Sequence, residues 1–64
     1  MKVIERLSNS MILELSEPEV EIIHAALNEV CNGIDVPEFH ARIGAGVGEV
    51  RKLLFSLGSL LPGL

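Results

Sequence analysis

A helix-start signal near residue 16 constrains the fold most, because it fixes where the chain changes from extended to helical. Ser16 and Glu19 have the spacing of a capping box, in which each side chain accepts a hydrogen bond from the other residue's backbone N–H. Leu15 and Val20 stand at the positions of a hydrophobic staple. The sequence therefore predicts a helix over residues 17–32, with a glycine directly after it as the stop.

The same signal recurs after that glycine. Asp35 and Glu38 repeat the capping box, and Ile34 and Phe39 repeat the staple. We therefore expect a short second helix over residues 36–43, ended by the next glycine.

A third helix is expected over residues 47–61. Its N-cap is Gly46, and Pro62 follows its end. Its apolar residues recur at spacings of three and four, as one face of a helix requires, and they are Val50, Leu53, Leu54, Leu57 and Leu60 or Leu61.

Residues 36–57 match a helix-turn-helix pattern, in which two short helices meet at a sharp corner. Gly44 allows the tight turn, and Ala45 packs inside it. The side chains expected to face inward and close the corner are Phe39, Ile43, Val50 and Leu53.

Residues 2–15 read as a β-hairpin turning at Ser8, Asn9 and Ser10, residue types that favour turns. A three-residue loop pairs Leu7 with Met11 and avoids placing Glu5 opposite Glu14, so we favour that register. It puts Val3, Leu7, Met11, Leu13 and Leu15 on one face. A lone hairpin is marginally stable, so it must pack on a helix or pair with another chain.

These elements predict one α+β, mostly α domain over residues 1–64. Apolar residues make up 48% of the chain and aromatic residues 3%, so the core must be aliphatic. Cys31 is the single cysteine, which excludes an internal disulfide and indicates a reducing, cytoplasmic setting. Charges in the first fifteen residues argue against a signal peptide, and no stretch is long and apolar enough to span a membrane.

The residue pattern does not indicate catalysis, and we expect no enzyme, cofactor or metal site. His24 and Cys31 lie seven residues apart on the first helix, but a zinc site requires four ligands, and paired Cys or His spacings are missing. The glycine run at 44, 46 and 48 follows a helix rather than a strand, so it does not resemble a nucleotide loop.

The surplus of apolar residues is the main functional indication. Several lie off the expected core faces, and large exposed apolar patches usually mark a partner. A small non-enzymatic interaction module acting as a homodimer is therefore the first functional hypothesis. Its candidate interface residues are Ile4, Ile12, Ile22, Phe55, Leu60 and Leu61.

Two other functions remain as alternatives. A DNA-binding helix-turn-helix regulator could use Arg42, Arg51 and Lys52 as phosphate contacts. The positions that would read bases are Gly46 to Glu49 and offer no hydrogen-bond donor side chain, which weakens this alternative. The acidic block from Glu14 to Glu38 could instead bind a basic protein partner, as an immunity protein or antitoxin does.

Three short runs of the sequence carry a resemblance to other proteins. They are Ala-Leu-Asn-Glu-Val at residues 26–30, Ile-Asp-Val-Pro-Glu-Phe at 34–39 and Arg-Ile-Gly at 42–44. In these runs the chain resembles a group of small bacterial proteins of unknown function. The likeness covers residues 15–57 and leaves the hairpin outside it. In that group a helix precedes a helix-turn-helix-like tail. The resemblance implies the order of the helices and assigns no activity and no site residues.

Overall fold

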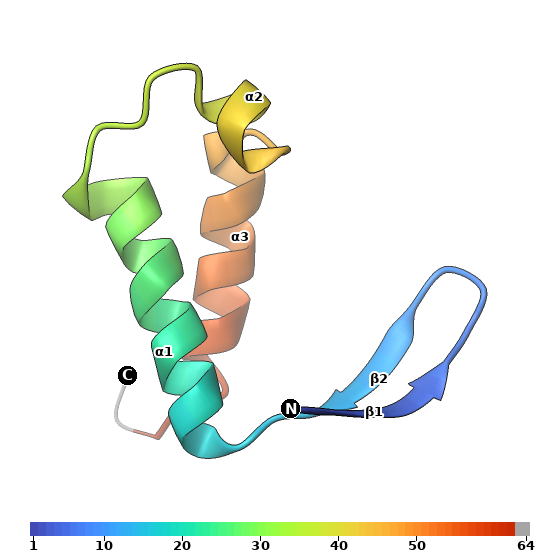
Figure 1. The fold of residues 1–64 in the computed structure, drawn as a ribbon. Helices are drawn as coiled ribbons and strands as arrows, with labels where there is room; N and C mark the ends of the chain where they lie inside the picture. The colour runs from blue at the N-terminus through green and yellow to red at the C-terminus, as the bar shows by residue number, and fades with distance from the viewer. Residues whose placement is uncertain (63–64) are drawn as a thin grey trace.

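The computed structural model describes residues 1–62 and shows a β-hairpin followed by three helices, which confirms the α+β, mostly α class. Helices α1 and α3 run antiparallel, side by side, and the short helix α2 lies beyond the start of α3 (Figure 1). In chain order the elements are β1 (Lys2–Arg6), β2 (Met11–Glu14), α1 (Glu17–Asn28), a π-helical turn η1 (Glu29–Gly33), α2 (Phe39–Ile43) and α3 (Val47–Gly58).

Helix α1 begins where the sequence predicts, and both halves of the capping box form. The Glu19 carboxylate accepts from the Ser16 backbone N–H at 2.8 Å, and the Ser16 hydroxyl oxygen accepts from the Glu19 N–H at 3.2 Å. Together these bonds satisfy two backbone donors that a helix start otherwise leaves free. Pro18 lies in the first turn, where its missing N–H costs nothing.

The helical segment ends at Gly33, one residue beyond the expected range, because its last turn is wider than an α-helical turn. This turn is η1, in which the Ile34 N–H donates to the Glu29 carbonyl oxygen at 2.9 Å, five residues back. Ile34 is then extended, with φ −121° and ψ 156°.

Helix α2 starts at Phe39, so the expected start at residue 36 is wrong. Val36 is β-branched and precedes Pro37, and both properties disfavour the helical conformation at that residue. Glu38 precedes the helix in the left-handed region, with φ 52°, and no side chain within residues 1–62 caps the helix. The second capping box therefore does not form.

The turn into α3 uses glycine as predicted, because Gly44 adopts φ 90°, which side-chain-bearing residues rarely reach. The expected end of α3 at residue 61 is wrong. The helix ends at Gly58, after which Leu60 and Leu61 donate to carbonyl oxygens only three residues back. This tighter winding turns Leu61 inward, where it is 8% exposed.

The core lies between α1 and α3 and is small. Its buried side chains are those of Val20, Cys31, Val50 and Leu61. Two residues expected to close the helix-turn-helix corner are exposed instead, Ile43 at 40% and Leu53 at 53%. The reason is that α3 packs on α1 rather than on the short α2, so the buried stripe of α3 starts at Val50 and continues one turn later at Leu54 rather than at Leu53.

The hairpin register also differs from the expected one. Arg6 pairs with Met11 and Val3 with Leu13, and a bulge lies between Val3 and Glu5. The loop is Leu7 to Ser10, closed by the Leu7 N–H donating to the Ser10 carbonyl oxygen at 2.9 Å. This loop also keeps Glu5 away from Glu14, so charge repulsion alone does not select a three-residue loop.

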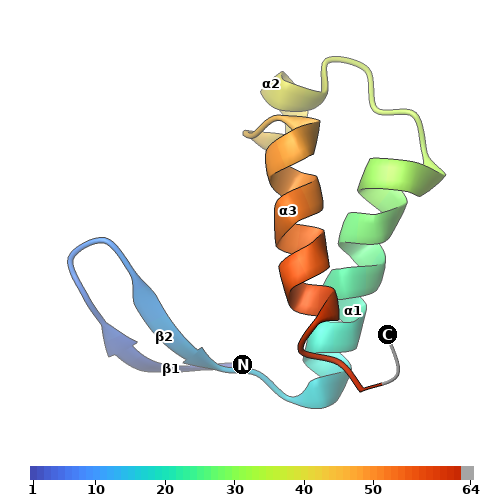
Figure 2. The same ribbon diagram turned by 180° about the vertical axis from the view of Figure 1, so that it is seen from behind.

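The hairpin extends away from the helices as an arm (Figures 1 and 2). Within residues 1–62, β1 and β2 pack on each other and make no extensive contact with a helix. Every residue of both strands is exposed. The hairpin therefore does not obtain its cover from the helices of its own chain. Among the same residues no helix has the length and apolar character needed to cross a bilayer.

Candidate interaction site

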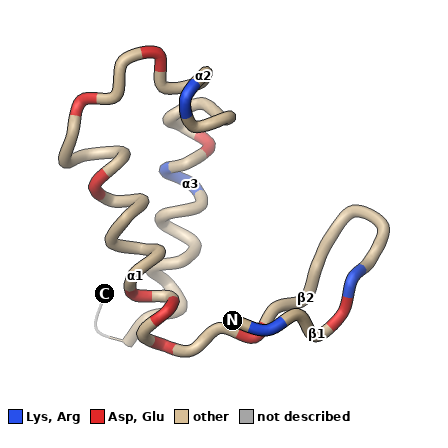
Figure 3. The backbone as a smooth tube through the Cα atoms, in the orientation of Figure 1, with Lys and Arg blue, Asp and Glu red and all other residues tan. Residues whose placement is uncertain are grey.

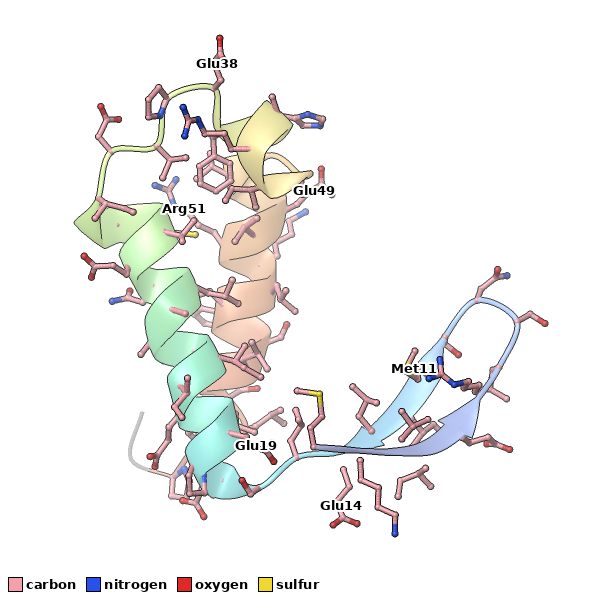
Figure 4. All side chains as sticks on the ribbon, viewed as in Figure 1. Met11, Glu14, Glu19, Glu38, Glu49 and Arg51 are labelled. Carbon is pink, nitrogen blue, oxygen red and sulfur yellow. The ribbon has the colours of Figure 1, made fainter. Side chains whose placement is uncertain are left out.

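The hairpin arm, residues 2–14, exposes apolar side chains on both of its faces. Directly opposed residues of an antiparallel pair share a face, so Val3, Met11 and Leu13 lie together. Their exposed fractions are 40%, 47% and 41%. Ile12 projects from the other face and is 47% exposed. Figure 4 shows the labelled Met11 and Glu14 on opposite sides of the ribbon, as this alternation requires.

The arm makes the molecule larger than a compact domain of its length. The radius of gyration is 13.1 Å, whereas a compact 64-residue domain has roughly 11 Å. The accessible surface is 4979 Å², whereas a folded monomer of 6.9 kDa exposes roughly 4,000 Å². The excess is about 1,000 Å², similar to the area that one partner buries in a standard protein interface.

A second apolar surface lies along one side of the α1–α3 pair. It is an open groove of about 480 Å³, lined among others by His24, Arg51, Leu54 and Phe55. Phe55 is 84% exposed at this groove. Gly58 lets His24 approach α3, because a Cβ atom at this position would lie 3.1 Å from His24 Nε2.

The predicted interface residues fall in several places rather than in one patch. Ile4 and Ile12 lie on the hairpin arm, and Phe55 lies at the groove. Ile22 is 69% exposed and stands two residues from the buried Val20, which puts it on the opposite side of α1. Leu60 is 67% exposed beyond the end of α3. Leu61 belongs to the core and is only 8% exposed.

Sequence reasoning missed the exposure of Val3, Met11 and Leu13. It placed them on one face of a hairpin that must pack on a helix or pair with another chain, and the structure leaves that face uncovered by the helices. The signal that could have identified them is the hairpin itself, because two strands alone cannot form a sheet that buries a face. The same reasoning missed the exposed Ile43 and Leu53, whose exposure follows from the shortness of α2.

The charged residues of helix α1 are all acidic, whereas the Lys and Arg residues lie on β1, α2 and α3, close to acidic residues (Figure 3). The predicted phosphate contacts lie on α2 and the first half of α3, with Arg51 lining the groove. Glu38 and Glu49 lie at the same end of the molecule (Figure 4). The first turn of α3 presents Val47, Gly48 and Glu49, none of which donates a side-chain hydrogen bond.

An ion pair joins the base of the arm to α1. The Met1 ammonium group donates to the Glu19 carboxylate at 2.6 Å. This hydrogen bond, followed by those from the backbone N–H and the side chain of Ser16, lowers the pKa of Glu19 from 4.5 to about 2. The side chain that caps α1 therefore also binds the residue that precedes β1.

The titratable residues do not converge on a chemical centre in the part of the chain that the structure describes. Cys31 is a buried, free thiol, which suits a small core residue. Across residues 1–62, no three His, Cys, Asp or Glu side chains are grouped where they could hold a metal ion.

Comparison of the chain with protein-family models, with curated proteins and with solved structures finds no match.

Proposed function

We propose that this protein is a small, non-enzymatic protein-interaction module that acts as a homodimer, with the hairpin arm as its main contact. The observation that carries the proposal is the position of the arm. It stands off the helices with every strand residue exposed. A two-stranded hairpin in water is marginally stable, so a well-formed arm requires cover from elsewhere.

The exposed area supports a second copy as that cover. The excess of about 1,000 Å² over a compact monomer is close to the roughly 800 Å² that each partner buries in a standard interface. The apolar part of that surface contributes about 25 cal/mol per Å² when it leaves water, and this contribution favours association against its entropy cost. Few other sources of stability are available to a chain of 64 residues with one cysteine.

The homodimer also accounts for more of the molecule than the two alternatives do. DNA binding through Arg42, Arg51 and Lys52 would use the end of the molecule around α2 and the start of α3, and would leave the arm uncovered. A basic partner docked on the acidic residues would engage mainly charged groups, whereas the arm exposes Val3, Met11, Ile12 and Leu13. Only a contact on the arm removes these side chains from water.

The mass of the purified chain tests the proposal. Light scattering behind a sizing column should give twice the chain mass of 6.9 kDa at micromolar concentration. The thermal midpoint should rise with protein concentration, because mass action favours a folded dimer. A mass of one chain over the whole range, together with a midpoint independent of concentration, would refute the homodimer.

A further inference from the structure

We propose that the two copies join through β2, whose free edge pairs antiparallel with β2 of the second copy to give a four-stranded sheet. This inference rests on the proposed homodimer and adds the strand, the register and the residue at the twofold axis. Three observations carry it: the unequal protection of the two hairpin edges, the direction of the β2 backbone groups, and the charges along β2.

The two edges of the hairpin differ in how they are protected. Strand β1 carries a bulge between Val3 and Glu5 and two cationic side chains, Lys2 and Arg6. Bulges and edge lysines are the devices by which natural sheets block pairing with another chain. Strand β2 is regular and reads Met-Ile-Leu-Glu, without a lysine, proline or bulge. The edge of β2 is therefore open to another strand.

Two residues of β2 present both their backbone N–H and their backbone C=O group at this edge. The Ser10 carbonyl oxygen accepts from Leu7, so the backbone groups of Ser10 point toward β1. Successive residues of an antiparallel strand direct these groups to alternate sides. Met11 and Leu13 therefore direct their N–H and C=O groups outward, away from β1.

One register uses both of these residues. With Ile12 on the twofold axis, Met11 of each copy pairs with Leu13 of the other, and all four outward N–H groups donate to carbonyl oxygens. If the twofold axis passed through Met11, Leu13 would lie opposite a loop residue of the second copy. If it passed through Leu13, Met11 would lie opposite a residue beyond the end of β2 in the second copy. Ile12 then faces Ile12 of the second copy in a non-hydrogen-bonded pair, with Cα atoms about 4.5 Å apart.

Side-chain chemistry agrees with that register. Glu14 lies opposite Ser10 of the second copy, so the two Glu14 carboxylates do not face each other. Met11 and Leu13 of both copies become neighbours on one face, continuous with Val3 at its border. The exposed apolar side chains of two arms thus meet in the middle of one sheet.

Cysteine cross-linking tests the strand and its register. In a Cys31→Ala background, Ile12→Cys should form a disulfide-linked dimer on mild oxidation, because a Cα separation of about 4.5 Å suits a disulfide. Ile4→Cys is the matched control, an exposed isoleucine at the β1 bulge of the same arm. We expect cross-linking of Ile12→Cys to be at least about tenfold faster, because the dimer holds its thiols at high effective concentration.

The possible outcomes distinguish a failure of the β2 pairing from a failure of the proposed homodimer. A dimeric mass with faster cross-linking at Ile12→Cys supports both. A dimeric mass with faster cross-linking at Ile4→Cys, or with equal slow rates, overturns the β2 pairing and leaves the homodimer intact. A monomeric mass overturns both. The register has its own check: Met11→Cys should cross-link readily when mixed with Leu13→Cys and slowly alone, and the reverse pattern contradicts the Ile12 axis.

Discussion

The Met1 ammonium group lies 2.6 Å from the Glu19 carboxylate, so the residue that precedes β1 is bonded to the first turn of α1. Because Glu19 also completes the capping box with Ser16, one carboxylate joins the start of the helix to the base of the arm. The contact between Met1 and α1 thus depends on a group whose charge changes with pH.

The Glu19 contacts predict a pH-dependent contribution to stability. The folded-state pKa of Glu19 is about 2, below the ordinary value of 4.5, so folding favours the ionised form. The contribution is therefore fully present above pH 4.5 and is lost as the pH falls toward 2. Glu19→Gln keeps an acceptor for the Ser16 N–H but loses the charge. The gap in denaturation midpoint between wild type and Glu19→Gln should be constant above pH 5 and shrink below it, whereas a gap that does not change with pH would contradict the assignment.

The capping box predicts a measurable cost at Ser16. Ser16→Ala removes the hydroxyl oxygen that accepts from the Glu19 N–H and should lower the free energy of unfolding by about 1 kcal/mol. At fixed protein concentration this corresponds to a fall of roughly 4–8 °C in the thermal midpoint. Ser56→Ala is the control, an exposed serine within α3 whose hydroxyl donates to the Lys52 carbonyl oxygen at 3.0 Å. Because such a bond within a helix contributes little stability, the substitution should change the midpoint little. Equal effects of the two substitutions would show that the cap contributes no stability.

The close approach of His24 to Gly58 predicts an energetic coupling between the two positions. Gly58→Ala should gain helix propensity, worth up to about 1 kcal/mol, but its new Cβ would meet His24 Nε2 at 3.1 Å. The substitution should therefore stabilise a His24→Ala background more than it stabilises the wild type. Chemical denaturation of the four proteins should give a coupling on the order of 0.5 kcal/mol or more. The same effect of Gly58→Ala in both backgrounds would contradict the contact.

The sequence predicted the elements whose signals are local. The capping box at Ser16 and Glu19 located the start of α1, and the glycine at position 44 located the turn into α3. The second capping box failed at Asp35 and Glu38 because a competing local preference, that of Val36 before Pro37, disfavoured the helix. A matching motif is therefore insufficient where a neighbouring residue opposes it.

The hairpin register and the position of the arm could not be predicted from the sequence. Loops of three and four residues both keep Glu5 from Glu14, and the Ile4 bulge that selects between the registers leaves no mark in the residue pattern. Whether the apolar face of the hairpin packs on α1 depends on contacts far apart in the chain, which periodicity does not encode. Candidate surface residues such as Ile12 and Phe55 were predicted from a surplus of apolar residues, and they are exposed. The sequence did not distinguish Leu61 from these exposed residues, because the tight turn after Gly58 is what buries it.

Sedimentation equilibrium of two lysine variants tests the central claim, that a second copy covers the hairpin arm. Ile12 and Ile22 are both exposed isoleucines, one on the arm and one on the side of α1 away from α3. Ile12→Lys would place like charges next to each other in the dimer and should weaken association by about tenfold or more, or 1.4 kcal/mol. Ile22→Lys should form a dimer that dissociates no more readily than the wild-type dimer. A monomeric wild type, or a dimer that Ile22→Lys dissociates and Ile12→Lys does not, would contradict the claim.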